Sequence, residues 1–152
     1  MGKQNAPSPN LMIVEGDEEA GAYIKLRLWQ YSMSQVRYDR ERVIESVYLM
    51  LKDPDKQIMG GLVAYIDTYW RSCHINILWI EEQYRNLGYG SQLLRKLEEI
   101  VQKRKCGLIT LNTASFYAPE FYAKHEYELC GAINNYPPGH SLYYFKKTIT
   151  SK

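Results

Sequence analysis

The chain has 152 residues, of which 45% are hydrophobic and 24% charged, with a formal net charge of +2. This length suits one domain with a single core, and the absence of an apolar run near the roughly 18 residues that cross a bilayer argues against a membrane partner. So small a net charge also argues against a nucleic-acid partner. We expect residues 1–9 to be a flexible leader, because they lack the apolar segment of a secretory signal, and residues 10–150 to be a single domain.

The cysteines and the one basic cluster suggest no metal or RNA chemistry. Cys73, Cys106 and Cys130 form no C-x-x-C pair and have no zinc-like spacing with histidines, and their odd number argues against a disulfide framework. We therefore expect a reducing, cytoplasmic setting and no metal. The cluster at 103–105 could indicate an RNA-associated domain, but cations at a helix C-terminus, facing the negative end of its dipole, explain it more simply.

The first half of the chain predicts one strand, one helix and a hairpin. Residues 10–16 (NLMIVEG) have the composition of a short strand, and Asp17 with two following glutamates indicates a helix start. Residues 43–66 contain two β-rich runs separated by a Pro- and Asp-containing segment that favours a turn. Residues 72–80 (SCHINILWI) are apolar enough to form a central strand.

The second half of the chain begins with its most clearly indicated helix. That helix has apolar residues at helical spacing, namely Leu93, Leu94, Leu97, Ile100 and Val101. Gly107 stands where a C-cap glycine is expected. The remaining predicted elements are a buried strand, a short helix and two closing strands, at residues 108–112, 119–125, 127–133 and 142–149. The order β-α-ββ-β-α-β-α-ββ predicts a mixed α/β (α+β) sheet of about six to seven strands with flanking helices.

The sequence RNLGYG, residues 85–90, leads directly into that helix. It is not a P-loop, because Ser91-Gln92 replaces the required Lys-Ser/Thr, and it is not a Rossmann fingerprint, because Leu93 replaces a third small residue. An R-x-x-G-x-G loop before a helix can turn its amides toward an anion, and glycines let phosphate oxygens approach the backbone. Taken alone, two such glycines are more often a tight turn.

The order of these motifs resembles the GNAT superfamily of acetyl-CoA-dependent N-acetyltransferases, and in particular its small bacterial-type members. The likeness rests on LWIEEQYRNLGYGSQLLRKLE, residues 78–98, and on APEFYAKHEYE, residues 118–128. Two positions depart from the family pattern where glycine is usual: Asn86, which tolerates left-handed backbone well, and Glu126, where some strain is expected. Ser115 replaces an asparagine that often contacts the cofactor, so no role is assigned to it.

The resemblance implies a cofactor site built on backbone. It implies that parallel strands at residues 73–80 and 108–112 splay apart, so that the pantetheine arm of acetyl-CoA pairs with the first of them. The backbone near Trp79 and Ile80 would hold the thioester carbonyl. The loop and first helical turn would hold the pyrophosphate, through Arg85, Asn86, Leu87, Gly88, Tyr89, Gly90 and Ser91.

The resemblance also implies that Tyr122, in Tyr-x-Lys, lies near the cofactor sulfur and protonates or hydrogen-bonds the departing thiolate. A protonated amine cannot attack a thioester, so a proton acceptor is useful. His74 is the first candidate, because it lies on the strand before the glycine motif and has suitable chemistry; Glu81 and Glu82 are the alternatives. For these three residues a non-catalytic strand or loop position remains an open reading.

The leading hypothesis is an N-acetyltransferase that acts on a primary amine of a small molecule or a protein, by direct attack in a ternary complex. The alternative is a non-catalytic acyl-CoA-binding sensor or interaction module that has kept the cofactor loop. A homodimer remains open, and the sequence identifies neither the acceptor nor the acyl preference.

Overall fold

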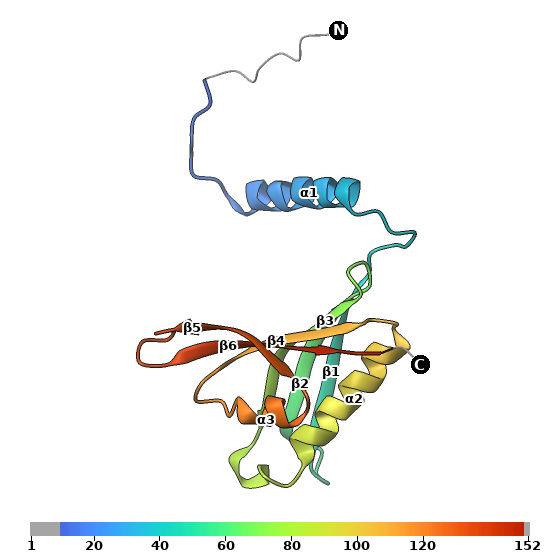
Figure 1. Ribbon diagram of the computed structural model, residues 1–152, viewed down its shortest axis with the longest axis vertical. Helices are drawn as coiled ribbons and strands as arrows, with labels where there is room; N and C mark the ends of the chain where they lie inside the picture. The colour runs from blue at the N-terminus through green and yellow to red at the C-terminus, as the bar shows by residue number, and fades with distance from the viewer. Residues whose placement is uncertain (1–9, 151–152) are drawn as a thin grey trace. The chain divides into compact units, whose positions relative to one another are not determined.

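The computed structural model describes residues 10–150, so the predicted leader at residues 1–9 lies outside the described residues. The described chain forms two compact units, residues 10–39 and residues 40–150 (Figure 1). The single domain expected over residues 10–150 therefore stays a prediction. No helix among residues 10–150 combines the length and the apolar character needed to cross a membrane.

The first unit contains helix α1, Glu18–Gln35. Asp17 caps it as predicted, because its carboxylate accepts a hydrogen bond from the Ala20 amide at 2.9 Å. The strand expected at residues 10–16 is wrong: this segment has no strand conformation and pairs with no described strand. A strand needs a neighbour to satisfy its backbone groups, and composition alone does not supply one.

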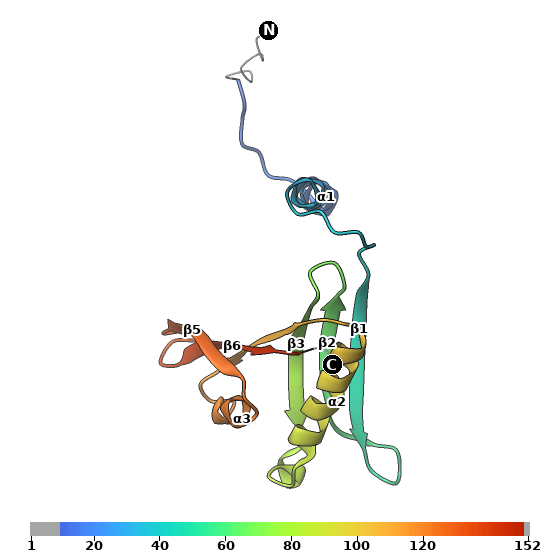
Figure 2. The same cartoon turned by 45° about the vertical axis from the view of Figure 1, so that its right-hand side comes forward.

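The second unit is built on a six-stranded mixed sheet with the order β1-β2-β3-β4-β6-β5. The predicted hairpin and central strand are confirmed as β1 (Ile44–Lys52), β2 (Ile58–Asp67) and β3 (Ser72–Ile80). The later strands are β4 (Leu108–Ala114), β5 (Glu128–Asn134) and β6 (Ser141–Thr148). Among the strands of residues 10–150, only the β3–β4 pair is parallel. In Figure 2 the first three strands run vertically while β5 and β6 cross the view, as in a strongly twisted sheet.

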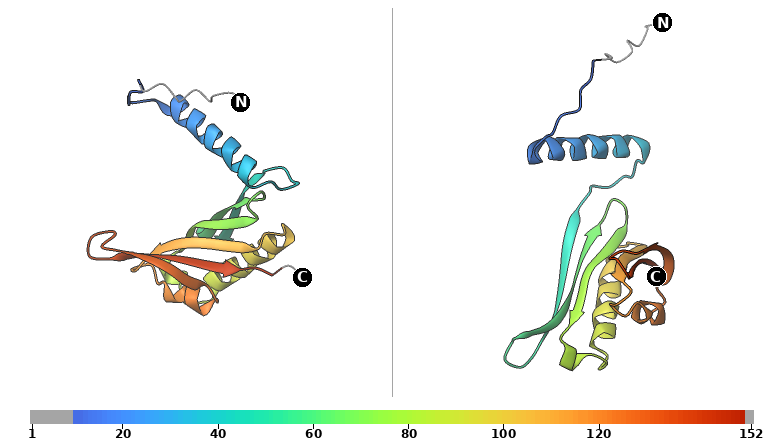
Figure 3. Two further views of the ribbon diagram at one scale, coloured as in Figure 1. Left: turned by 45° about the horizontal axis from the view of Figure 1, so that its top comes forward. Right: turned by 90° about the vertical axis from the view of Figure 1, so that its left-hand side faces the viewer.

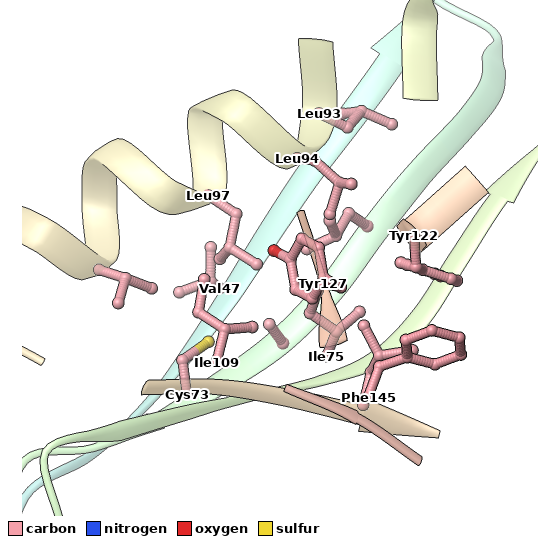
Figure 4. Close-up of a cluster of buried hydrophobic side chains, with 14 of the residues drawn as sticks. Val47, Cys73, Ile75, Leu93, Leu94, Leu97, Ile109, Tyr122, Tyr127 and Phe145 are labelled. Atoms are coloured by element: carbon pink, nitrogen blue, oxygen red, sulfur yellow. The ribbon is translucent and has the colours of Figure 1, made fainter. Parts of the chain in front are cut away.

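Helix α2 (Tyr89–Lys103) covers one face of this sheet, running beside β1–β3 (Figure 3). Its predicted apolar stripe is confirmed, since Leu93, Leu94, Leu97 and Val101 are buried. Figure 4 shows the three leucines pointing into a cluster with side chains from the strands and from helix α3 (Glu120–Lys124). Burial of each such side chain contributes about 1.5–3 kcal/mol, which fixes the N-terminus of α2 relative to the sheet.

The predicted C-cap at Gly107 is wrong by two residues. Lys105 takes the left-handed conformation that ends the helix, with φ of 56°. Gly107 instead begins the next strand region, donating its amide to the Arg71 carbonyl and accepting from the Ile149 amide. For a residue other than glycine this conformation costs about 1–2 kcal/mol. The favourable position of a cation near a helix C-terminus offsets part of that cost.

The parallel strands β3 and β4 separate partway along their length, as the splayed pair was expected to do. Their register runs from Ser72↔Leu108 to Ile75↔Leu111 and stops there. Directly after Ile75, the β2–β3 register shifts so that Ala64 pairs with Ile75 but Val63 pairs with Ile77, which leaves Asn76 as a bulge. A bulge bends its strand, so β3 turns away from β4 and leaves a fork in the sheet.

Candidate active site

A cavity of about 800 Å³ occupies this fork. The separated ends of β3 and β4 form two of its walls, and the loop before α2, the first turn of α2 and helix α3 complete it. A volume of this size suits a small molecule or a cofactor segment. The cavity-lining residues that were predicted from sequence are Trp79, Ile80, Arg85, Asn86, Gly88, Tyr89, Gly90, Ser91 and Tyr122. Leu87 belongs to the same loop but is not part of the wall.

The loop before α2 is shaped by its own side chains. After a single 3-10 turn at Glu82–Tyr84, the Arg85 Nε donates to the Ile80 carbonyl oxygen at 2.8 Å. The same guanidinium lies 4.4 Å from the centre of the Trp79 ring. Arg85 therefore ties the loop back onto the end of β3, which holds the loop beside the fork.

Gly88 and Gly90 serve different purposes. Gly88 has φ of 89°, a left-handed conformation that glycine adopts without strain, and open space lies where a Cβ would stand. Gly90 has an ordinary φ, but an added Cβ would lie 3.1 Å from Cζ of Phe121. Asn86 also adopts the left-handed conformation, with φ of 60°, as its substitution for glycine requires. The first glycine turns the loop, and the second lets α3 pack on α2.

The amides at the start of α2 belong to residues that line the cavity, and they have no intrahelical partners. Gln92 makes the first helical hydrogen bond, to the Gly88 carbonyl at 3.1 Å, so the amides of Tyr89, Gly90 and Ser91 precede it. No acidic residue lies in this first turn and no side chain caps it. Free amides at the positive end of a helix dipole form a cradle for an anion, here the first turn of α2 and the preceding loop, residues 86–91.

Tyr122 reaches the cavity from the other side, on α3. Its side chain is buried, 7% exposed, among the rings of Phe121, Tyr127 and Phe145 at centroid distances of 5.2, 5.9 and 5.9 Å. Burial raises the pKa of Tyr122 to about 12. The hydroxyl therefore stays protonated near neutral pH, and it can donate a hydrogen bond to a negatively charged atom in the fork.

The exit from α3 is held by a network that the sequence did not reveal. Glu126 has φ of 66°, the strained conformation expected where the family pattern has glycine. Lys147 compensates locally: its Nζ donates to Glu98 at 3.0 Å and to the His125 carbonyl at 2.9 Å, and lies 3.9 Å from the Glu126 carboxylate. The Tyr127 hydroxyl also donates to Glu98, at 3.2 Å. These contacts lock α3 against α2 and β6.

The three candidate bases do not line the cavity. His74 alternates with the buried Cys73 and Ile75, so its side chain lies on the sheet face opposite the core, 2.8 Å from Thr110 Oγ1 through Nδ1. Partial burial lowers the His74 pKa. Glu81 and Glu82 are exposed residues after β3. The base assignment therefore stays a prediction, and within residues 10–150 the wall of the cavity has Arg85 as its one charged side chain.

No group of three or more His, Cys, Asp or Glu side chains among residues 10–150 is arranged to hold a metal ion. The expectation of a metal-free reaction stays a prediction. A mixed sheet forked at its parallel pair, with an anion cradle on one side and a buried tyrosine on the other, fits the acyl-coenzyme A site that the family resemblance implies.

Comparison with known proteins gives the same class. The model of the acetyltransferase (GNAT) family matches residues 15–131, and the chain belongs to this family. It is similar to an acetyltransferase from Bacillus cereus ATCC 14579, with 38% identity, a TM-score of 0.84 and coverage of 91% of this chain and 97% of that one. The predicted family and fold class are confirmed, as is the prediction that the protein is an acyltransferase. The alternative of a non-catalytic acyl-CoA-binding module stays a hypothesis.

Two further similarities are more distant or partial. The chain is 33% identical over 84 residues to Blasticidin-S acetyltransferase of Streptomyces morookaense, covering 55% of this chain and 60% of that relative's length. A Bacillus anthracis protein, provisionally named a streptothricin acetyltransferase and solved in complex with acetyl coenzyme A, shares 18% identity and a TM-score of 0.56. Their alignment covers 77% of this chain and 68% of that one, and at this identity it shows the fold alone.

Proposed function

We propose that the protein transfers an acetyl group from acetyl-CoA to a primary amine of a small molecule, by direct attack in a ternary complex. The observation that carries the proposal is the single cavity that joins the anion cradle, the fork between β3 and β4, and the side chain of Tyr122. These three features suit, in turn, the pyrophosphate, the pantetheine arm and the sulfur of the cofactor.

In this proposal the cofactor is held mostly by backbone. The pyrophosphate lies on the amides of residues 86–91, with Arg85 beside it. The pantetheine arm extends along the edge of β3 that faces the fork, where residues 77–80 have no β4 partner. Strand-like pairing with an unpaired edge is a common way to bind an extended ligand. The thioester carbonyl then lies near the backbone of Trp79 and Ile80, where an amide directed into the fork can stabilise a tetrahedral oxyanion.

The chemistry requires one bond to form and one to break. The amine lone pair attacks the thioester carbonyl carbon, the new C–N bond forms, and collapse of the tetrahedral intermediate breaks the C–S bond. Tyr122 donates a hydrogen bond to the departing thiolate. Because the pKa of Tyr122 is raised to about 12 and a thiol has a pKa of about 8.5, a hydrogen bond is favoured over full proton transfer, and water supplies the final proton.

The amine must lose a proton before it attacks. For an amine of pKa about 10.4, selecting the neutral form at pH 7 costs about 4.6 kcal/mol, so a proton acceptor accelerates the reaction. We propose that the acceptor enters the fork from the sheet face that carries His74, and that His74 takes the proton through water, with Glu81 or Glu82 as alternatives. The lowered pKa of His74 supports this role, because it keeps the imidazole neutral at pH 7.

Small-molecule antibiotics are the first acceptors to test, because of the compounds in the names of the similar proteins. The experiment is acetyl-CoA-dependent thiol release over an amine panel that contains blasticidin S, a streptothricin, polyamines, amino sugars and a lysine peptide, with mass spectrometry of the product. Acetylation of one small amine well above background supports the proposal. Acetylation of the peptide alone would move the substrate class to proteins, and tight acetyl-CoA binding without transfer to any amine would contradict catalysis.

A further inference from the structure

Ser91 and His125 connect the anion cradle to helix α3. Ser91 lies in the first turn of α2 and lines the cavity, whereas His125 is the residue that ends α3. Ser91 Oγ and His125 Nε2 are 2.8 Å apart, across 34 positions of sequence. Both side chains are half-buried. A hydrogen bond of this length, made outside any secondary-structure ladder, aligns the serine hydroxyl within the cradle.

Contacts hold both the imidazole and the backbone of His125. The Phe121 ring packs against it with centroids 4.8 Å apart, and the same ring lies against Gly90 in the cradle. The Lys147 ammonium donates to the His125 carbonyl at 2.9 Å, which fixes the backbone at this position. His125 is therefore presented to Ser91 by α3 in one orientation, with little rotamer freedom left to lose on ligand binding.

The serine hydroxyl has a single proton, so the direction of this hydrogen bond decides what Ser91 offers to the cavity. If His125 Nε2 accepts, the serine hydroxyl donates its proton to the imidazole, and its oxygen lone pairs face an incoming anion. If Nε2 carries the proton and donates, the serine proton is free to be donated into the cradle. A phosphate oxygen is an acceptor only, so it favours the second arrangement.

We infer that His125 donates its Nε2 proton to Ser91 Oγ and so commits the serine hydroxyl as a donor to the pyrophosphate of acetyl-CoA. This inference rests on the proposed function, because the pyrophosphate belongs to the proposed cofactor, acetyl-CoA. His125 is a positioning residue that acts through Ser91. Two hydrogen bonds in a chain polarise one another, so the contribution of His125 to anion binding exists only while the Ser91 hydroxyl is present.

The test is a double-mutant cycle on the affinity for acetyl-CoA, measured by calorimetry on the full chain. We expect Ser91→Ala to weaken binding about 10- to 100-fold, the range for losing a hydrogen bond to a charged group. We expect His125→Ala to weaken binding about 5- to 10-fold, because His125 does not contact the anion and acts through Ser91. In the Ser91→Ala background, His125→Ala should cost less than about twofold. His125→Gln, whose amide can donate from the position of Nε2, should recover most of the affinity.

Different failures have different meanings. If wild-type protein does not bind acetyl-CoA, the proposed function fails and the inference fails with it. If wild type binds but the two substitutions are additive, or His125→Ala binds as wild type does, the inference alone is overturned. If His125→Ala proves misfolded by its melting temperature, ¹⁵N chemical shifts of His125 in the wild-type complex with coenzyme A decide the matter. A protonated Nε2 supports the inference, and a neutral ring with the proton on Nδ1 overturns it.

Discussion

Replacing Tyr122 by Phe removes one hydroxyl from the fork and leaves its surroundings intact. The ring keeps its contacts with Phe121, Tyr127 and Phe145 in the core cluster, so we expect an unchanged fold and unchanged acetyl-CoA affinity. What is lost is a neutral donor whose pKa burial has raised to about 12. The effect should therefore appear in kcat, because the thiolate that accepts this hydrogen bond develops only as the C–S bond breaks.

The size of the effect follows from the kind of hydrogen bond. Full proton transfer from a group of pKa about 12 to a thiolate of pKa about 8.5 is unfavourable by roughly 5 kcal/mol, so Tyr122 contributes as a hydrogen-bond donor to a charged sulfur. Such bonds contribute about 1.5–3 kcal/mol, which corresponds to a kcat about 10- to 150-fold lower in Tyr122→Phe.

The assay is steady-state thiol release with the best amine of the panel, between pH 6 and pH 10. Because the raised pKa keeps Tyr122 protonated over this interval, the ratio of wild-type to Tyr122→Phe kcat should be constant, and it should fall only as pH approaches about 12. Equal kcat values in the two proteins would refute the catalytic reading of Tyr122. A ratio that titrates near pH 8 would refute the reasoning about its pKa.

The remaining predictions concern the cradle, the base and the thiols. Acetyl-CoA should raise the melting temperature of wild type but not of Gly88→Glu, because the added carboxylate occupies the cradle. Gly139→Ala, with a similar φ of 84° outside the cavity, is the control for backbone strain, and loss of the rise in that variant would contradict the cradle. If His74 is the base, wild-type kcat/KM should rise with pH through the pKa of His74, which burial lowers below the usual range for histidine. His74→Ala should lose most activity at neutral pH and recover part of it at alkaline pH. A deficit of His74→Ala that is constant with pH would indicate lost packing instead. The exposed Cys130 should react with an aromatic disulfide reagent well before Cys73, because burial raises the pKa of Cys73 to about 12. Cys130→Ser should therefore remove the fast background of the thiol-release assay. An unchanged fast phase in this variant would contradict the exposure of Cys130.

Elements with a strong local signal were predictable from sequence, and elements defined by distant partners were not. The apolar stripe of helix α2 predicts that helix, and the turn residues predict the β1–β2 hairpin. In that turn the Gln57 amide donates to Asp53 Oδ1 at 2.8 Å. The strand expected at residues 10–16 fails because pairing depends on a neighbour. The C-cap expected at Gly107 fails because Lys105 accepts the left-handed conformation two residues earlier.

The same division holds for the candidate site. Two motifs with characteristic spacing led to the loop of residues 85–91 and to Tyr122, and all of these except Leu87 line one cavity. Sequence could not place His74 on a sheet face, since that depends on strand alternation within a sheet whose partners were unknown. Nor could it find the contact between Ser91 and His125, because nothing local in either segment signals a partner in the other.

The central claim is that the first turn of α2 and the fork together hold acetyl-CoA for transfer. The most direct measurement is a crystal structure of the protein with coenzyme A. We predict pyrophosphate oxygens within about 2.7–3.2 Å of backbone amides in residues 86–91, and the sulfur in the fork within hydrogen-bond reach of the Tyr122 hydroxyl. Pyrophosphate bound away from these amides, or a pantetheine arm that does not enter the space between β3 and β4, would contradict the claim.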